Sequence, residues 1–326
     1  MDLPAGANVA LTYANDRKTD GAGAQLQRVY GIYAISRFLK LPYVHSPLTR
    51  IGYQGLSSLQ TNSSSAELES RYNRIFNIPS DIELPKERVI YDITDADVDV
   101  IQRLQIAAKD IGKFVLIRIL YPYPVTDRSP ELYQHVKTIS PFRRPRSDIF
   151  RLALHVRRGE QIALGSDRML PNSYFVSCAL KFIDVMKRLD IPFVCELFTE
   201  VPSKAFIVTP DHHGIDGRIP GNVTVDPRVN RLEDFEVIPN LVSCINDDPI
   251  DTLRRMATAD GLVLSRSSYS YVAAILGTNS VVIYRPFWHG RLDEWLTSDE
   301  DGNFSDADLT ARLECWKRER SGSRLA

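Results

Sequence analysis

The sequence predicts an α/β protein with two Rossmann-like domains, each built on a parallel sheet, that face a cleft. Three observations lead to this expectation. Strand-like and helix-like segments alternate through both halves of the chain, which favours parallel sheets. A polar loop with Gly21 and Gly23 joins the first strand-like segment to the first helix-like one. The chain has 326 residues, more than one hydrophobic core usually contains.

The first domain is expected to span residues 1–144. Its strands are short apolar runs, and its helices have apolar residues three and four positions apart. Asp97 precedes a helical pattern as an N-cap would, and Ser129-Pro130 opens another such pattern. In chain order we expect a strand at 8–14, a helix at 25–40, a strand at 41–47, a short helix within 56–86, a strand at 88–93, a helix at 98–112, a strand at 114–121 and a helix at 129–139.

The second domain is expected to span residues 145–326. A stretch rich in Pro and Arg at 141–148 interrupts the alternation and indicates the boundary. The same alternation then resumes to the end of the chain. In order we expect a strand at 149–156, a helix at 171–190, a strand at 192–200, a long loop, a helix at 247–259, a strand at 260–265, a helix at 267–277, a strand at 279–285 and a helix at 306–320.

Composition excludes several classes of function. Lys and Arg number 40 against 41 Asp and Glu, so the chain lacks the basic field on which many nucleic-acid-binding proteins rely. No apolar run reaches the ~18 residues that a membrane span needs, and the N-terminus does not resemble a signal peptide. The four cysteines form no Cys-x-x-Cys pair, which favours buried free thiols. We therefore expect a cytoplasmic protein without a membrane span.

The first candidate site is His155-Val156-Arg157-Arg158-Gly159-Glu160, where a buried strand is expected to end. Ligands of open parallel sheets bind beyond the carboxyl ends of the strands. Two adjacent arginines there suit an anion such as phosphate, because a guanidinium forms charge-assisted and often bidentate hydrogen bonds. The alternative is a solvated arginine pair bridged to Glu160.

The second candidate site is the serine-rich segment from Ser265 to Ser270, between an expected strand and an expected helix. Ser267 and Ser268 stand at the helix start. Ser is a favoured N-cap, and the free N–H groups of a helix start can bind an anion. Capping alone is the alternative, but it requires only one serine.

Three weaker signals remain. The loop Gly21-Ala22-Gly23-Ala24-Gln25 can bring backbone amides close to a ligand, or can simply form a tight turn. Glu200 ends an expected strand and Asp251 lies in an expected helix. Either carboxylate can accept hydrogen bonds from a guanine edge or take a proton from a sugar hydroxyl, or can be a surface charge.

No metal site is predicted. Asp95 and Asp97 are better explained by helix capping, and His212-His213 with Asp216 lacks a third ligand on a rigid element. The chain also has no Gly-x-Ser-x-Gly elbow and no P-loop, which removes the usual support for a hydrolase or an NTPase.

The segment 155–160 closely resembles the His-x-Arg-Arg-x-Asp peptide of the α1,2-, α1,6- and protein O-fucosyltransferase superfamily. Further segments resemble the same group in the same order along the chain, at 21–33, 168–175, 198–203 and 250–276. The resemblance implies a GT-B-like fold, an inverting transfer of fucose from GDP-fucose to a glycan hydroxyl, and no essential metal or other cofactor. It places the acceptor on the first domain and the nucleotide sugar on the second.

The resemblance also implies roles for individual residues. Arg157 matches the arginine on the donor β-phosphate, and Arg158 matches a second arginine that contacts the donor or orders the loop. Positions near the guanosine are matched by His155 and Asp251, and phosphate-binding positions at the helix start by Ser267 and Ser268.

The sequence departs from the family at three positions, which concern acceptor and linkage more than the donor. Glu160 stands where the motif has Asp, Ala24 where protein O-fucosyltransferases have Asn, and Glu200 where α1,6-type members have Asp. Glu160 is our first candidate for the catalytic base, and Asp167 the second. Another nucleotide sugar such as GDP-mannose, or a non-catalytic glycan- or nucleotide-binding protein of this fold, are the alternatives.

Overall fold

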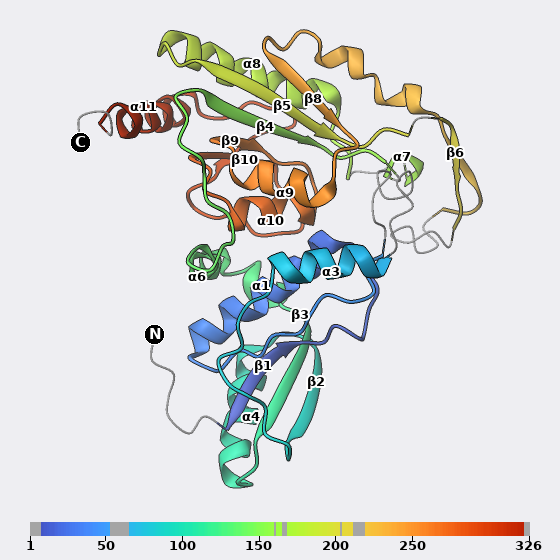
Figure 1. The fold of residues 1–326 in the computed structure, drawn as a ribbon, viewed down its shortest axis with the longest axis vertical. Helices are drawn as coiled ribbons and strands as arrows, with labels where there is room; N and C mark the ends of the chain where they lie inside the picture. Colours follow the sequence, from blue (N-terminus) through green and yellow to red (C-terminus); the bar gives the residue numbers. More distant parts are fainter. Residues whose placement is uncertain are drawn as a thin grey trace. The chain divides into compact units, whose positions relative to one another are not determined.

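The computed structural model describes residues 8–52, 65–159, 161–164, 168–202, 204–210 and 219–322. These residues form two compact units, which we describe separately. Unit 1 contains 8–52, 65–141 and Trp288–Leu292, and unit 2 contains Phe142–Phe287 and 293–322, in their described parts. The path of the chain through these elements is coloured in Figure 1.

Unit 1 has a parallel three-stranded sheet in the order β1-β3-β2. Its helix α1 is almost entirely buried, in keeping with its many apolar residues and two internal glycines. Asp97 caps α4, accepting hydrogen bonds from the N–H groups of Asp99 and Val100, as the sequence predicted. The elements are β1 (Val9–Tyr13), α1 (Ala22–Leu39), α3 (Ser65–Ile75), β2 (Val89–Asp95), α4 (Val98–Asp110), β3 (Val115–Tyr121), α5 (Tyr123–Thr126), η1 (Pro130–Tyr133) and α6 (Gln134–Lys137).

Two predictions for unit 1 need correction. The segment 41–47 is not a strand, because it forms only one parallel bridge, between Tyr43 and Leu11. The backbone N–H groups of Tyr43 and His45 donate to the side chains of Asp81 and Ser80 rather than to a further strand. The helix predicted at 129–139 is split into a 3₁₀ turn, η1, followed by the short α6.

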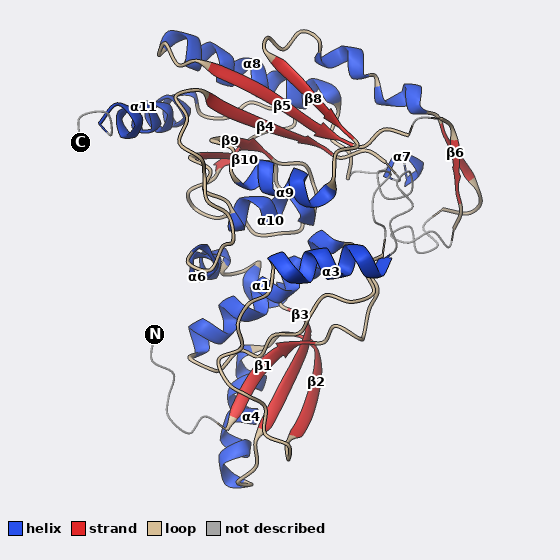
Figure 2. Cartoon of the chain, in the orientation of Figure 1, coloured by secondary structure: helices blue, strands red, loops and turns tan. Residues whose placement is uncertain are grey.

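Unit 2 has a six-stranded sheet whose paired neighbours are all parallel (Figure 2). A small antiparallel sheet of β6 and β7 stands apart from it. The elements are β4 (Phe150–Val156), α7 (Gln161–Leu164), α8 (Asn172–Arg188), β5 (Phe193–Thr199), β6 (Phe206–Val208), β7 (Val223–Val225), η2 (Pro227–Asn230), η3 (Leu232–Phe235), β8 (Leu241–Ile245), α9 (Pro249–Ala257), β9 (Gly261–Val263), α10 (Ser268–Leu276), β10 (Val281–Tyr284), β11 (Leu296–Thr297) and α11 (Asp306–Gly322).

The strand order of unit 2 identifies its fold class. From one edge to the other the sheet reads β8-β5-β4-β9-β10-β11. Numbered along the chain within this sheet, that is the order 3-2-1-4-5-6 of doubly wound nucleotide-binding folds. The parallel sheet, with α8 and α11 on one face and α9 and α10 on the other, confirms the predicted α/β class (Figure 1).

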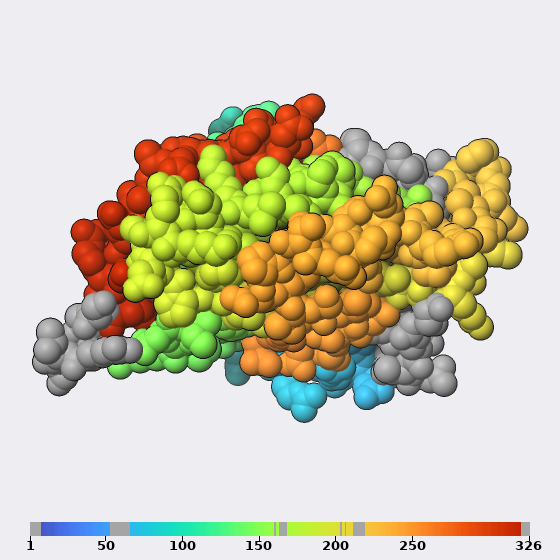
Figure 3. Space-filling view, turned by 90° about the horizontal axis from the view of Figure 1, so that it is seen from above, coloured from blue at the N-terminus to red at the C-terminus, as the bar shows by residue number. Residues whose placement is uncertain are grey.

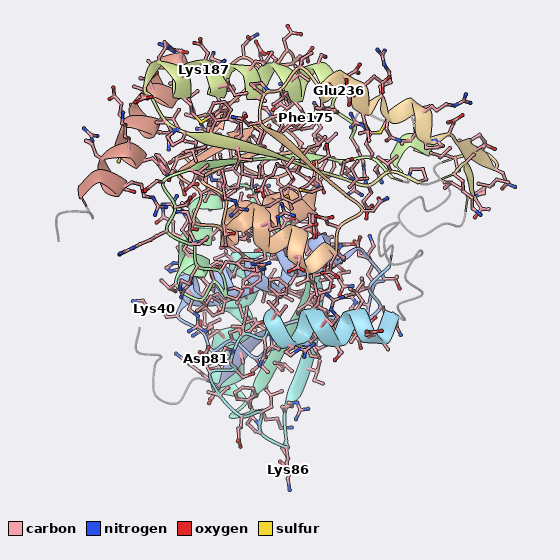
Figure 4. All side chains as sticks on the ribbon, turned by 45° about the horizontal axis from the view of Figure 1, so that its top comes forward. Lys40, Asp81, Lys86, Phe175, Lys187 and Glu236 are labelled. Atoms are coloured by element: carbon pink, nitrogen blue, oxygen red, sulfur yellow. The ribbon has the colours of Figure 1, made fainter. Side chains whose placement is uncertain are left out.

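The side chains of β4 alternate between the two faces of this sheet, as the period of a strand requires. Phe150, Leu152, Leu154 and Val156 belong to the apolar core that also contains α8 and α11. The intervening residues face α9 and α10, where Arg151 pairs with Glu196. On α8 itself, Phe175 is buried and Lys187 is exposed (Figure 4).

Further findings concern the general predictions. Cys178, Cys195 and Cys244 are buried free thiols, whereas Cys315 is free but exposed. Burial raises the pKa of Cys178 and of Cys195 to about 12. No helix in the described ranges has the length and hydrophobicity that crossing a bilayer requires.

Candidate functional site

The candidate site of unit 2 lies where the strand order reverses, between β4 and β9. Crevices at such switch points, outside the carboxyl ends of the strands, are where open α/β sheets bind ligands. Leu154 of β4 pairs with Val263 of β9 in parallel register. The segments that follow the two strands therefore leave the same edge side by side. They are the arginine pair and the serine-rich segment that the sequence indicated.

His155 is buried near the end of β4 and joins the two segments. Its Nδ1 atom lies 2.6 Å from Ser265 Oγ, and its ring lies 5.8 Å from that of Tyr269. Burial, with the charges of Arg157 and Arg158, lowers the pKa of His155 to about 3. The imidazole is therefore neutral at physiological pH and can act as a hydrogen-bonding group rather than as a charge.

Arg157 follows β4 and reaches the start of α10. Its Nη1 donates a hydrogen bond to Ser267 Oγ at 3.0 Å. Ser267 is the N-cap of this nine-residue helix and also accepts the N–H of Tyr269 at 3.2 Å. A guanidinium and the N–H groups of a helix start thus converge on one place, and both favour an anion there. Ser268 is the first residue of the same helix.

Arg158 lies on the opposite side of the sheet edge. It donates to the carbonyl of Arg157 at 2.8 Å and to Asn172 Oδ1 at the start of α8. Burial lowers its pKa to about 10. The structure therefore brings Arg158 to α8, whereas Arg157 reaches α10.

The two candidate carboxylates of unit 2 have different surroundings. Glu200 directly follows β5, and the pairing of Val156 with Thr199 puts it at the same sheet edge as Arg157. Asp251 lies on the exposed side of α9 and pairs with Arg254 at 3.1 Å. Its recorded contacts do not join it to His155, whereas the resemblance places both near the guanosine.

The glycine loop belongs to unit 1, and Gly21 is the N-cap residue of α1. A Cβ atom added at Gly21 would meet nothing within 4 Å, so packing alone does not require glycine there. Gly23 lies inside the first turn of α1. The amide of Gln25 donates to the carbonyls of Asp20, Thr49 and Arg50 at 2.9–3.3 Å, which ties the surrounding loops together.

Two polar groups were missed by the sequence analysis. Arg28 of α1 is 2% exposed and contacts Asp20, the hydroxyl of Tyr13 at 3.3 Å and the hydroxyl of Tyr123 at 3.2 Å. The sequence feature that could have identified Arg28 is its place as a charged residue within the apolar helical pattern of 25–40. Asn172 of α8, the partner of Arg158, follows Pro171 in the helix-start pattern that Pro often marks.

Several predictions fall outside the described residues, among them both candidate bases, Glu160 and Asp167, and the His212-His213 pair. Among the residues that are described, no group of three or more His, Cys, Asp or Glu could hold a metal ion.

Comparisons with known proteins give little further information. No family model matches the chain, and no curated protein matches it. Among solved structures, E. coli heptosyltransferase WaaC with ADP-2-deoxy-2-fluoro heptose matches at 13% identity and a TM-score of 0.38, covering 95% of this chain and 99% of that one. The same enzyme with ADP matches at 12% identity and a TM-score of 0.38, with coverage of 96% and 99%. These scores assign no family, so the fold class rests on the strand order of unit 2.

Proposed function

We propose that this protein is a glycosyltransferase that binds the pyrophosphate of a nucleotide sugar with Arg157 and the start of α10. One observation carries the proposal: the Arg157–Ser267 contact lies at the switch point of a doubly wound sheet. That location is where such folds bind nucleotides, and its chemistry suits a diphosphate.

The proposed reaction needs a group that stabilises the departing diphosphate. Glycosyl transfer passes through a cation-like sugar while negative charge builds on the leaving group. Donors that are already aimed at this charge lower the barrier most effectively. Arg157, held by Ser267, and the N–H groups of α10 supply such donors. We infer that they take the role that a divalent ion has in other transferases.

For the donor we propose GDP-fucose, and for the product a fucosylated glycan. This part of the proposal rests on the resemblance of 155–160 and the ordered segments around it to the fucosyltransferase superfamily. Another nucleotide sugar such as GDP-mannose is the alternative donor. A binding protein that does not catalyse transfer is the alternative of a different class.

A binding experiment tests the diphosphate site directly. GDP, ADP and UDP are titrated by calorimetry into the wild type, Arg157→Ala and Arg254→Ala. Arg254 is the control because it is an exposed arginine of unit 2 that pairs with Asp251 on the same helix. We expect Arg157→Ala to weaken binding of the preferred nucleotide by about 10- to 10²-fold, the effect of losing one charged hydrogen bond. Absence of binding in the wild type, or equal binding in the two variants, would refute the proposal.

Turnover separates the remaining alternatives. GDP-fucose, GDP-mannose and ADP- and UDP-sugars are incubated with the enzyme and a glycan array, with and without EDTA. Transfer of fucose that persists in EDTA is the expected result. Transfer of another sugar would show that the donor is that nucleotide sugar and not GDP-fucose. Tight binding of GDP with no transfer and no slow donor hydrolysis would favour the non-catalytic binding protein.

A further inference from the structure

The two adjacent arginines act on opposite faces of the sheet edge. Alternation along β4 directs His155 to the face of α10 and Val156 to that of α8. The same alternation continues past the strand end, since Arg157 contacts Ser267 and Arg158 contacts Asn172. In this structure the two guanidinium groups of the tandem pair therefore meet different partners, Arg157 at the start of α10 and Arg158 at the start of α8.

Arg158 is a buried cation whose recorded partners are neutral. Its exposed fraction is 8%. Within the described ranges its hydrogen bonds go to the carbonyl of Arg157 and to Asn172 Oδ1, and no ion pair is recorded for it. Burying a guanidinium costs several kcal/mol unless its N–H groups are satisfied. Hydrogen bonds at this site are therefore what keeps Arg158 in place.

Asn172 is the second half of this arrangement. While its oxygen accepts from Arg158, its Nδ2 donates to the carbonyls of Asn230 and Arg231 at 2.9 and 3.1 Å and to Asp234 Oδ2 at 3.1 Å. The segment 230–234 therefore lies beside the start of α8, and the stretches of chain that contain them adjoin on the face shown in Figure 3. The amide thus links Arg158 to this segment and to the carboxylate of Asp234.

We propose that Arg158 and Asn172 are positioning residues, which fix the backbone of Arg157 so that its guanidinium meets Ser267. Arg158 acts on the carbonyl of Arg157, and Asn172 holds Arg158. This inference rests on the proposed function for its effect on nucleotide binding. In this proposal Arg157 binds the nucleotide, and Arg158 holds the backbone of Arg157.

Asparagine is suited to this position for a chemical reason. The side chain must accept a hydrogen bond from a cation and donate to carbonyl oxygens at the same time, and an amide does both. Aspartate keeps the acceptor, loses both donors and adds a charge facing Asp234. Asn172→Asp therefore removes the hydrogen bonds to the segment 230–234, while it preserves the size of the side chain and its contact to Arg158.

A mutant cycle with a structure determination tests the proposal. Nucleoside diphosphate affinity is measured for wild type, Asn172→Ala, Asn172→Asp, Arg157→Ala and the double variant Arg157→Ala/Asn172→Ala. We expect a loss of about tenfold for Asn172→Ala, about the effect of one charged hydrogen bond, and a smaller loss for Asn172→Asp. In the Arg157→Ala background the second substitution should change affinity by less than about twofold, because the residue it positions is gone.

Controls separate positioning from folding. Asp184→Ala, an exposed change on the same helix, should leave affinity unchanged. Melting curves verify that each variant folds. A crystal structure of Asn172→Ala, or of Arg158→Ala if that variant does not fold, reads the position of Arg157 without any nucleotide. A shifted Arg157 that no longer contacts Ser267 is expected. An Arg157 that still contacts Ser267 in this structure would overturn the inference, and so would equal losses of affinity in both backgrounds of the cycle. The crystal structure decides the matter even if the wild type binds no nucleotide and the proposed function is wrong.

Discussion

His155 Nδ1 lies 2.6 Å from Ser265 Oγ, and both side chains are buried where β4 and β9 end. This contact connects the two segments that flank the switch point of unit 2. The imidazole is neutral because burial, together with Arg157 and Arg158, holds its pKa near 3. A charged imidazole here would repel both arginines, so the contact has a consequence for stability against pH.

The first prediction is that His155 destabilises the protein in acid. Its pKa in the folded state is far below that of the unfolded chain, about 6.5, so the unfolded state binds more protons between these values. The stability tied to the neutral form is complete above about pH 6.5 and is lost as pH falls toward 3. At pH 5 the loss should be on the order of 2 kcal/mol. Urea unfolding of wild type and His155→Asn at pH 7.5, 6 and 5 measures it.

Other groups contribute the background in this experiment. Burial also lowers the pKa of His45 and of His289, so both variants should lose stability in acid. The test is the difference between the two proteins. Between pH 7.5 and pH 5 the unfolding free energy of His155→Asn should fall less than that of the wild type. Parallel pH profiles for the two proteins would show that His155 does not titrate with unfolding.

The second prediction concerns Ser267, which caps α10 and accepts from Arg157. Ser267→Ala should cost about 1 kcal/mol of unfolding free energy, the usual effect of losing an N-cap. It should also weaken nucleoside diphosphate binding by about tenfold, because Arg157 loses its partner. Asp97→Ala is the matched control, since Asp97 caps α4 in unit 1. Asp97→Ala should lower the unfolding free energy without weakening nucleotide binding. An equal loss of binding in Asp97→Ala and Ser267→Ala would contradict the role of Ser267 as the partner of Arg157.

The third prediction concerns Asp251, whose recorded partner is Arg254 on the exposed side of α9. An exposed ion pair contributes little, so Asp251→Ala should change the unfolding free energy by less than about 0.5 kcal/mol. Affinity for GDP relative to ADP should change by less than about twofold. A selective loss for GDP, measured by calorimetry, would instead support the base-reading role that the resemblance implies.

The sequence predicted those features of unit 2 that depend on local patterns. Apolar runs bounded by polar residues identified β4 and β9, and the serine at the start of an apolar helix identified the cap at Ser267. Because parallel strands end at one edge, the two segments could be expected together. The strand β8 was missed, since Leu241–Ile245 lies at the edge of the sheet and buries only Cys244, so it has neither a continuous apolar run nor a regular alternation.

The partners of the buried polar groups could not be predicted. Asn172 meets Arg158, and Arg28 meets Asp20 and two tyrosines, through contacts that the tertiary fold creates. Spacing along the chain does not encode them. The direction of Asp251 is a similar case, because a helix position alone does not say which face will be covered. Local sequence patterns thus predicted which segments meet at the edge of the sheet. The hydrogen-bond partners of the side chains in those segments depend on the tertiary packing.

The fourth prediction separates Gln25 from Gly21, its neighbour in the loop before α1. The buried amide of Gln25 donates to three carbonyls, those of Asp20, Thr49 and Arg50. Gln25→Ala leaves these oxygens without that donor and should cost about 2 kcal/mol of unfolding free energy. Gln25→Glu should cost at least as much, because a carboxylate cannot donate and would face the same oxygens.

Gly21→Ala is the control for this measurement, because its backbone has φ −61° and an added Cβ would meet nothing within 4 Å. It should leave urea unfolding unchanged within about 0.5 kcal/mol. Transfer activity of the same variant then tests whether a ligand approaches the loop closely. Reduced turnover with unchanged stability would assign Gly21 to the ligand, since the methyl group meets none of the described residues. Unchanged turnover would leave the loop a structural turn tied by Gln25.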